Sequence, residues 1–224
     1  MDWSPILISM RTAGLSIVFT FFMGILAAWM VVRISHPLVK TILDGIFTIP
    51  LVLPPTVAGF FLLYVFGVKR PVGQFFLEYF SVKIAFSWGA TVLAAVVMSF
   101  PLMYRSARGA FEQVDDTLVQ AARTLGMGEW TIFRKVLLAN AVPGVVSGGV
   151  LAFARGLGEF GATAMIAGNI AGKTRTLPMA VYSEVAAGNM DAAYRYVAII
   201  VVIAFLSVIL MNRAALREKK RRLS

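Results

Sequence analysis

The 224-residue sequence contains no cysteine, a single histidine and few charged residues, and each shortage excludes a class of protein. Without cysteine the chain has neither disulfides nor thiolate metal sites. His36 precedes Pro37, and no second imidazole is present to help it hold a metal, so we interpret it as a loop residue and predict no metal site. Charged residues make up 14% of the chain, against roughly 25% in soluble domains.

The chain is rich in apolar residues, which make up 59% of the sequence, and its mean hydropathy is +0.81. Five apolar runs are long enough to cross a bilayer, which needs about 20 residues. The first run follows an uncharged opening apart from Asp2 and is longer than a signal-peptide core, so we interpret it as a retained span. The sequence predicts an all-α integral membrane protein with about five transmembrane helices, at 6–32, 42–66, 84–104, 142–167 and 197–211.

The net charge of +10 raises the possibility of nucleic acid, but the basic residues sit between apolar runs and form no aromatic-and-basic module. We expect no nucleic-acid partner. Most lysines and arginines fall on one side of the membrane if the C-terminus is inside, and cytoplasmic loops carry such an excess. We therefore predict an outside N-terminus and a basic cytoplasmic tail, 214–224, that attracts anionic membrane lipid.

Two segments resemble nucleotide-binding motifs without fitting them. Residues 156–161 have the dinucleotide spacing G-x-G-x-x-G but lie in a span with no preceding strand. Residues 168–174 are one residue short of a phosphate loop and are expected outside. We predict that the chain is not an enzyme, has no catalytic residues and binds no cofactor. If transport uses ATP, another subunit must bind it.

The longest polar stretch, 106–140, has the pattern of a helix–turn–helix. Thr117 and Gln120 match a capping box, and Gly126 is a helix-ending residue able to take positive φ. The apolar face of the first helix is predicted to lie either on the chain's own bundle or the lipid surface, or in a groove of a partner protein. The residues of this apolar face recur at helical spacing: Phe111, Val114, Leu118, Val119 and Ala122.

This stretch resembles the coupling loop of ABC-importer permeases, whose pattern is Glu-Ala-Ala, three residues, Gly, nine residues and then Ile-x-Leu-Pro. The matching positions are Gln120-Ala121-Ala122, Gly126, Val136 and Leu138, with departures at Gln120, Val136 and Ala139. The resemblance implies a set of residues that contact an ATPase subunit: Gln120, Ala121, Ala122, Arg123, Leu125 and Gly126.

Three further segments resemble molybdate-type permeases: 49–59, 85–88 leading to 98–102, and 151–163. The resemblance covers about residues 10–212. It implies one type I ABC-importer permease domain, 6–213, in the inner membrane. It also implies a homodimer, two ABC ATP-binding subunits that hold ATP and Mg²⁺, and an external binding protein that delivers molybdate, tungstate or sulfate.

The second span contains Pro50, Pro54 and Pro55, each of which removes a backbone donor and clashes with the preceding turn. The carbonyls that they free cannot be satisfied by lipid. These prolines either kink the span so that it packs against its neighbours, or they line the gate of the transport pathway.

The fourth span contains two ionisable residues, Arg155 and Glu159, whose spacing of four lets them pair. They either pair with each other or contact the anion, and a weak polar path along Thr56, Ser99 and Thr163 is equally plausible. Small residues at every fourth position form a ridge for close helix packing: Gly144, Gly148, Ala152 and Gly156.

Two other classes of function would also use a bundle of membrane spans. A stand-alone channel or secondary carrier needs charged rings or an intramembrane relay, and Arg155 and Glu159 are the clear intramembrane ions. A non-transporting scaffold leaves the Ala-Ala-x-x-x-Gly spacing and the proline breaks unexplained.

Overall fold

The computed structural model describes residues 2–223, leaving aside the side chains of residues 211, 212 and 214–223. This part of the chain is helical and contains no strand, which confirms the predicted all-α class. The elements are α1 (Ser4–Val32), α2 (Pro37–Val52), α3 (Pro55–Phe66), α4 (Pro71–Phe80), α5 (Trp88–Glu112), α6 (Asp116–Thr124), α7 (Glu129–Ile132), the π-helical η1 (Phe133–Leu137), α8 (Leu138–Leu157), α9 (Gly161–Ile166), α10 (Leu177–Ala186) and α11 (Met190–Leu223).

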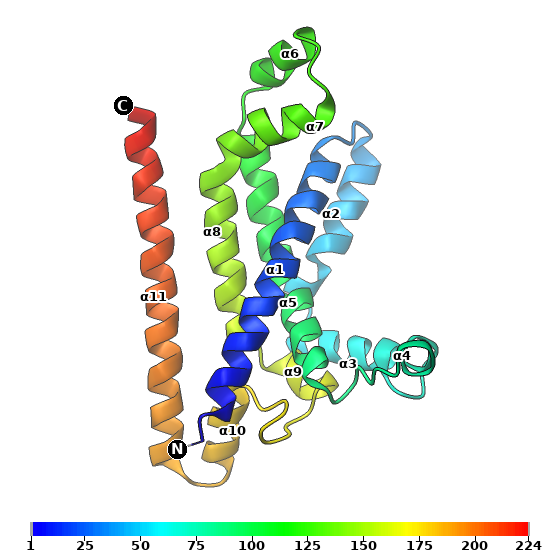
Figure 1. Ribbon diagram of the computed structural model, residues 1–224, viewed down its shortest axis with the longest axis vertical. Coiled ribbons are helices and arrows are strands. Elements are labelled where there is room, and N and C mark those ends of the chain that lie inside the picture. Colours follow the sequence, from blue (N-terminus) through cyan, green and yellow to red (C-terminus); the bar gives the residue numbers. More distant parts are fainter. Residues whose placement is uncertain (1, 224) are drawn as a thin grey trace.

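Four helical runs in the described chain are long and apolar enough to cross a membrane, and α2 with α3 forms a fifth, bent candidate. The four are α1, α5, the run Glu129–Leu157 that ends in α8, and Met190–Leu210 of α11. This agrees with the prediction of about five spans. Helices α6 and α7 lie at the same end of the bundle as the C-terminus, whereas the N-terminus and α10 lie at the opposite end (Figure 1).

The core is formed where α1, α5 and α8 pack on one another, with α11 against α8. The predicted ridge of small residues lies on α8 and lets this helix approach α5 closely. A Cβ added at Gly148 would lie 2.5 Å from the Ser106 Cβ, and one at Gly144 would lie 2.6 Å from the Ala110 Cβ. Because Ser106 and Ala110 belong to α5, the ridge serves packing within the subunit.

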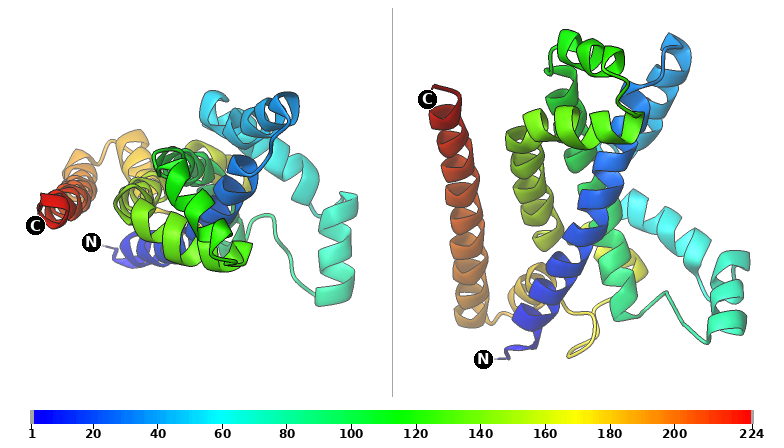
Figure 2. Two further views of the ribbon diagram at one scale, coloured as in Figure 1. Left: turned by 90° about the horizontal axis from the view of Figure 1, so that it is seen from above. Right: turned by 45° about the horizontal axis from the view of Figure 1, so that its top comes forward.

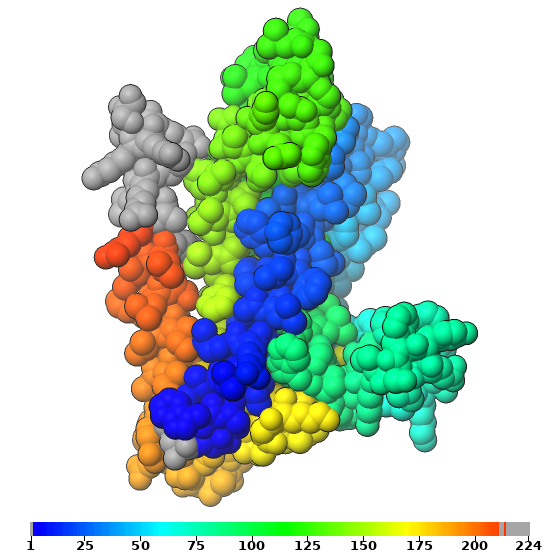
Figure 3. Space-filling view, viewed as in Figure 1, coloured from blue at the N-terminus to red at the C-terminus, as the bar shows by residue number. Residues whose placement is uncertain are grey.

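The outer surface of the bundle carries large apolar side chains, as expected of a surface that faces lipid. Phe22 of α1 and Phe205 of α11 are 67% and 65% exposed. Isolated exposed apolar residues are common in soluble proteins, but here they run along whole spans. Helices α3 and α4 project from the side of the bundle (Figures 2 and 3).

The predicted second span, 42–66, is two helices bent by 110° rather than one continuous helix. A proline disfavours the helical conformation in the residue before it. Leu53 precedes Pro54, which precedes Pro55, so two consecutive residues are held extended, with ψ of 142° and 134°. Pro50 stays inside α2, where it removes one helical hydrogen bond without ending the helix.

Other boundaries also differ from the predicted spans. Helix α5 begins at Trp88 rather than 84 because the Ser87 hydroxyl accepts a hydrogen bond from the Ala90 amide, and it continues to Glu112, so the polar loop starts later than 106. The fourth run breaks at Gly158 before α9. The last helix starts at Met190 rather than 197. Apolar runs locate the lipid-facing part of a helix, not the turns beyond it. The side chains of the basic tail, 214–224, lie outside the described residues.

Candidate coupling surface and gate

Helix α6 begins at Asp116, and its N-cap lies two residues before the predicted cap, Thr117. The Asp115 carboxylate accepts hydrogen bonds from the Thr117 amide at 2.9 Å and from the Thr117 hydroxyl at 2.8 Å, which makes Asp115 the N-cap. The prediction that Thr117 caps the helix was therefore wrong. Donation from the backbone and the hydroxyl favours the ionised carboxylate and lowers the pKa of Asp115.

The apolar face predicted across 111–122 is divided between two helices. Phe111 belongs to the end of α5 and is buried there, whereas Leu118 of α6 is 47% exposed. Ala122 is buried and Val119 packs against the core cluster of the chain's own bundle. The face is thus partly used within the subunit, and its outer part is left open.

The residues predicted to contact an ATPase subunit form a small knob at the end of the molecule (Figure 1). Gln120, Ala121 and Arg123 are exposed, and Leu125 is 80% exposed. Gly126 has φ of +73°, the left-handed conformation that the helix end requires and that glycine adopts without a Cβ clash. Ala122 alone of the set is buried. Contact with a partner stays a prediction for all six.

An ion pair on each side of Glu129 ties this knob to the end of α1. One carboxylate oxygen lies 2.9 Å from Arg123 Nε, and the other lies 3.3 Å from Arg33 Nη2. The Arg33 guanidinium also stacks over the Trp29 ring at 4.7 Å. Trp29 contacts Trp130 and Phe133, with ring centroids 5.8 and 4.7 Å apart.

We call the six residues Trp29, Arg33, Arg123, Glu129, Trp130 and Phe133 the α1 clamp. Sequence reasoning did not identify it. Only the spacing of four between Trp29 and Arg33 pointed to a shared face on α1, and nothing local linked that face to Glu129, about a hundred residues later.

A second charged group joins α2 to α5 and was also missed. Glu112 lies 3.0 Å from both Lys40 and Arg108, Arg108 also pairs with Asp44, and the Tyr104 hydroxyl donates to Asp44 at 2.9 Å. The formal charges of the two cations, Lys40 and Arg108, and of the two anions, Asp44 and Glu112, sum to zero. The spacing of four within each helix was the available signal, since Lys40 and Asp44 share one face and Tyr104, Arg108 and Glu112 share another.

The two broken spans meet backbone to backbone. A Cβ added at Gly59 of α3 would lie 2.6 Å from the Ala162 Cα of α9, and one at Gly161 would lie 2.8 Å from the Pro55 Cβ. This brings the predicted residues Pro55 and Thr56 against the segment that follows Glu159, and Pro54 immediately precedes this contact. Thr56 is exposed beside this contact.

Glu159 stabilises the break between α8 and α9. Its carboxylate lies 2.6 Å from Arg155 Nη1 and also accepts a hydrogen bond from the Ala162 amide at 2.7 Å, at the start of α9. Glu159 is only 2% exposed, whereas the Arg155 side chain is 28% exposed. The carboxylate therefore positions α9 against α3.

Ser99 and Thr163, predicted on a polar path, lie in helix interfaces. Both are essentially inaccessible, and the Ser99 hydroxyl is 3.0 Å from the Thr20 hydroxyl and 2.6 Å from the Ala95 carbonyl. A second pair of hydroxyls, Thr12 and Thr91, lies 2.9 Å apart along the same two helices. This α1–α5 ladder was missed, although Ser9, Thr12, Ser16 and Thr20 recur every three or four residues in the first span.

Within the described residues, no group of three or more histidine, cysteine or acidic side chains could hold a metal ion.

The family described as "Binding-protein-dependent transport system inner membrane component" matches residues 20–222. The chain belongs to this family. Among its relatives is the "Molybdenum transport system permease protein ModB" of Escherichia coli (strain K12), 42% identical over 98% of this chain and 96% of the relative. The protein of the same name from Haemophilus influenzae is 36% identical over 99% of this chain and 96% of the relative.

Solved structures of ABC importers share the fold of this permease. An inward-facing MetNI methionine transporter gives a TM-score of 0.74 at 18% identity, covering 96% of each chain. A bacterial importer of the polysaccharide alginate gives 0.78 at 15% identity, covering 96% of this chain and 78% of that one. The permease therefore has the type I ABC-importer permease fold. It is a multi-pass inner-membrane transport subunit and is not itself catalytic; its family implies an ATP-binding subunit and a binding protein.

Proposed function

We propose that this permease is the membrane subunit of an ATP-driven importer that moves molybdate or tungstate across the cytoplasmic membrane by alternating access. The supporting observation is the 42% identity, over 98% of the chain, to a permease named for molybdenum transport. A sulfate-type importer is the alternative, because sulfate is also a tetrahedral dianion. Selectivity among these anions can reside in the delivery protein, since affinity in the pore must stay low enough for release.

The proposed assembly contains two copies of this chain, two ATPase subunits that hold ATP and Mg²⁺, and an external oxyanion-binding protein. The N-terminus would lie outside and the C-terminus inside. Support comes from the placement of α6 and α7 at the C-terminal end of the bundle, together with the excess of basic residues there. ATP can drive the transport cycle only if it binds the two states of the complex with different free energies.

In this proposal the contact between α3 and α9 is the gate. Two short helices that start at breaks can move relative to their longer partners with few hydrogen bonds lost. Arg155 and Glu159 would hold the closed form, and Thr56 would face the passing anion. Pro50, Pro54 and Pro55 would keep the second span broken, while Ser99 and Thr163 would act by holding the neighbouring helices.

The coupling assignment is tested with Gly126→Leu, which places a side chain on the exposed knob. Gly188→Leu is a matched control, because both glycines have positive φ, of +73° and +76°, and neither has an atom within 4 Å of its added Cβ. Gly188 lies between α10 and α11, at the opposite end of the bundle. We expect Gly126→Leu to lose copurification of the ATPase subunit while inserting normally. Equal copurification of both variants would refute the assignment.

The substrate is tested by uptake of labelled molybdate into proteoliposomes that contain the full complex and internal ATP. Tungstate should compete at concentrations similar to molybdate, and sulfate only at much higher ones. Equal competition by sulfate supports the alternative importer. Uptake by vesicles that contain this chain alone, without ATP, would instead indicate a stand-alone carrier.

A further inference from the structure

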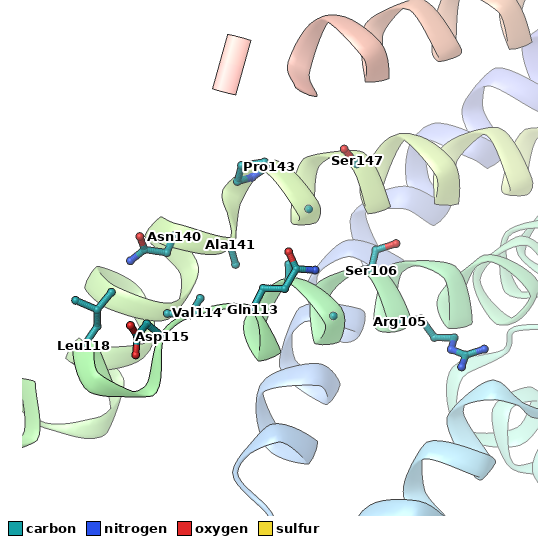
Figure 4. A pocket seen from close by; sticks show the side chains of 13 residues that line it. Arg105, Ser106, Gln113, Val114, Asp115, Leu118, Asn140, Ala141, Pro143 and Ser147 are labelled. Atoms are coloured by element: carbon teal, nitrogen blue, oxygen red, sulfur yellow. The ribbon is translucent and has the colours of Figure 1, made fainter. Parts of the chain in front are cut away.

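A polar groove of about 470 Å³ lies between the inner halves of α5 and α8, beside the start of α6. Side chains from both helices point into it or line its walls (Figure 4). Those that matter for its chemistry are Arg105, Ser106, Gln113, Asn140 and Ser147. The proposed function assigns nothing to this groove.

The groove is rich in hydrogen-bond donors. Ser106 and Ser147 bring hydroxyls, Gln113 and Asn140 bring amides, and Arg105 brings a guanidinium with five N–H groups. The Asn140 amide is already engaged within the chain, since its nitrogen donates to the Val136 carbonyl at 2.7 Å. The single carboxylate of the lining, Asp115, stands at the cytoplasmic end of the groove, where Thr117 donates two hydrogen bonds to it.

Arg105 forms no ion pair of its own, but its charge acts on Asp44, with which it lines a neighbouring pocket. No carboxylate of the described residues lies within 4.0 Å of it, in contrast to Arg108 one turn later. The nearby acids, Asp44 and Glu112, are matched by Lys40 and Arg108. Counted together, Lys40, Asp44, Arg105, Arg108 and Glu112 keep one net positive charge at the inner end of α5, and Arg105 is the member of this cluster that also lines the groove.

One face of α8 connects the groove to the gate. Asn140, Gly144, Ser147, Leu151 and Arg155 are spaced by three or four residues and so share a face. From Asn140 to Arg155 this face extends about 22 Å, at 1.5 Å per residue. Leu151, between the two polar ends, is 42% exposed, whereas Gly144 packs on Ala110 of α5, so this face is covered at Gly144 and open at Leu151.

We propose that this groove is the inner part of the oxyanion's route, with Arg105 as its attracting charge. The inference rests on the proposed function. A tetrahedral dianion leaving the gate beside Arg155 would follow the α8 face to Arg105, and the hydroxyls and amides would replace part of its water shell. One exposed cation attracts a dianion only weakly through water, which suits release into the cytoplasm.

The first test compares transport by Arg105→Gln and Arg105→Lys with Arg134→Gln, an exposed arginine at the same end of the molecule but outside the groove. With the ATPase subunits bound equally, we expect Arg105→Gln to lower the rate of molybdate uptake about tenfold, Arg105→Lys to retain most of it and Arg134→Gln to match the unaltered complex. Equal rates in Arg105→Gln and Arg134→Gln would overturn the proposal. An unaltered complex that does not accumulate molybdate would refute the proposed function itself.

The second test uses the absence of cysteine from the chain. Ser147→Cys, in a complex with cysteine-free partner subunits, is treated in inside-out vesicles with anionic and cationic methanethiosulfonate reagents. We expect the anionic reagent to react faster, tungstate to slow the reaction, and both effects to vanish when Arg105→Gln is added. His36→Cys, exposed in the loop before α2, should show neither effect. A reaction at Ser147→Cys without charge preference or protection would refute the groove as an anion route.

Discussion

At the scale of single residues, Glu159 has the clearest structural task. It is buried, pairs with Arg155 and accepts a hydrogen bond from the Ala162 amide in the first turn of α9. Replacement by alanine leaves that amide without an acceptor and the arginine without its partner. Because Arg155 keeps some access to solvent, the loss is nearer to that of one buried hydrogen bond than to that of a fully buried ion pair.

We predict that Glu159→Ala destabilises the purified permease by about 2 kcal/mol. For a chain of this length, this lowers Tm by about 4–8 °C. Glu159→Gln keeps an oxygen that can accept from the Ala162 amide and should lose about half as much. Thermal unfolding in detergent measures both, with Glu78→Ala on the exposed side of α4 as control. Equal losses for the alanine and glutamine variants would show that the cap of α9 contributes nothing.

At the scale of elements, the α1 clamp links the predicted coupling knob to the end of α1. Its ion pairs join side chains that are 41–54% exposed, at Arg33, Arg123 and Glu129, and solvent screens such pairs strongly. They therefore matter little for stability. Their consequence is geometric, because Glu129 joins the end of α6 to the end of α1.

We predict that Glu129→Gln leaves Tm within about 3 °C of the unaltered protein, since only exposed pairs are weakened. It should nevertheless raise the number of ATP molecules hydrolysed per anion transported, because α6 can then move without α1. Lys135→Gln, an exposed charge outside the clamp, is the control. An unchanged ratio of hydrolysis to transport in Glu129→Gln would show that the clamp does not transmit motion.

The bend between α2 and α3 can be measured directly. Spin labels at Val39 and Tyr64, both exposed, would lie about 38 Å apart on one straight helix of 1.5 Å per residue. For two helices bent by 110°, the same rise per residue places them about 21 Å apart. We expect the shorter distance by pulsed electron paramagnetic resonance. Dilution with unlabelled protein separates distances within a chain from those between copies, and a distance near 38 Å would mean that the second span is straight.

The same elements show what sequence alone could predict. The apolar runs located the spans, and Gly126 located the end of α6, because both follow from local chemistry. Pro54 and Pro55 predicted a break, but the angle of the bend depends on how Gly59 and Gly161 let α3 and α9 touch. The α1 clamp and the hydroxyl ladder between α1 and α5 join residues far apart in sequence. No local pattern could pair Thr20 with Ser99 or Arg33 with Glu129.

At the scale of the whole molecule, function depends on which end of the bundle faces the cytoplasm. The knob, the groove rim and the C-terminal end of α11 lie at one end, and the loop 167–176 lies with the N-terminus at the other. A motor subunit and an external delivery protein can act on the permease together only if these ends lie on opposite sides of the membrane. The proposed direction follows from the basic residues near the knob.

We predict that a membrane-impermeant maleimide applied to intact spheroplasts labels Lys173→Cys and spares Thr124→Cys, because the proposed orientation places the loop of Lys173 outside and the end of α6, with Thr124, inside. Both positions are exposed, so accessibility within the protein does not favour either. Thr124→Cys should react after permeabilisation in cells that lack the ATPase subunit, which would otherwise cover α6. Labelling of Thr124→Cys in sealed cells would place the knob outside, beyond the reach of any ATP-driven partner, and the coupling, gate and groove assignments would then fail together.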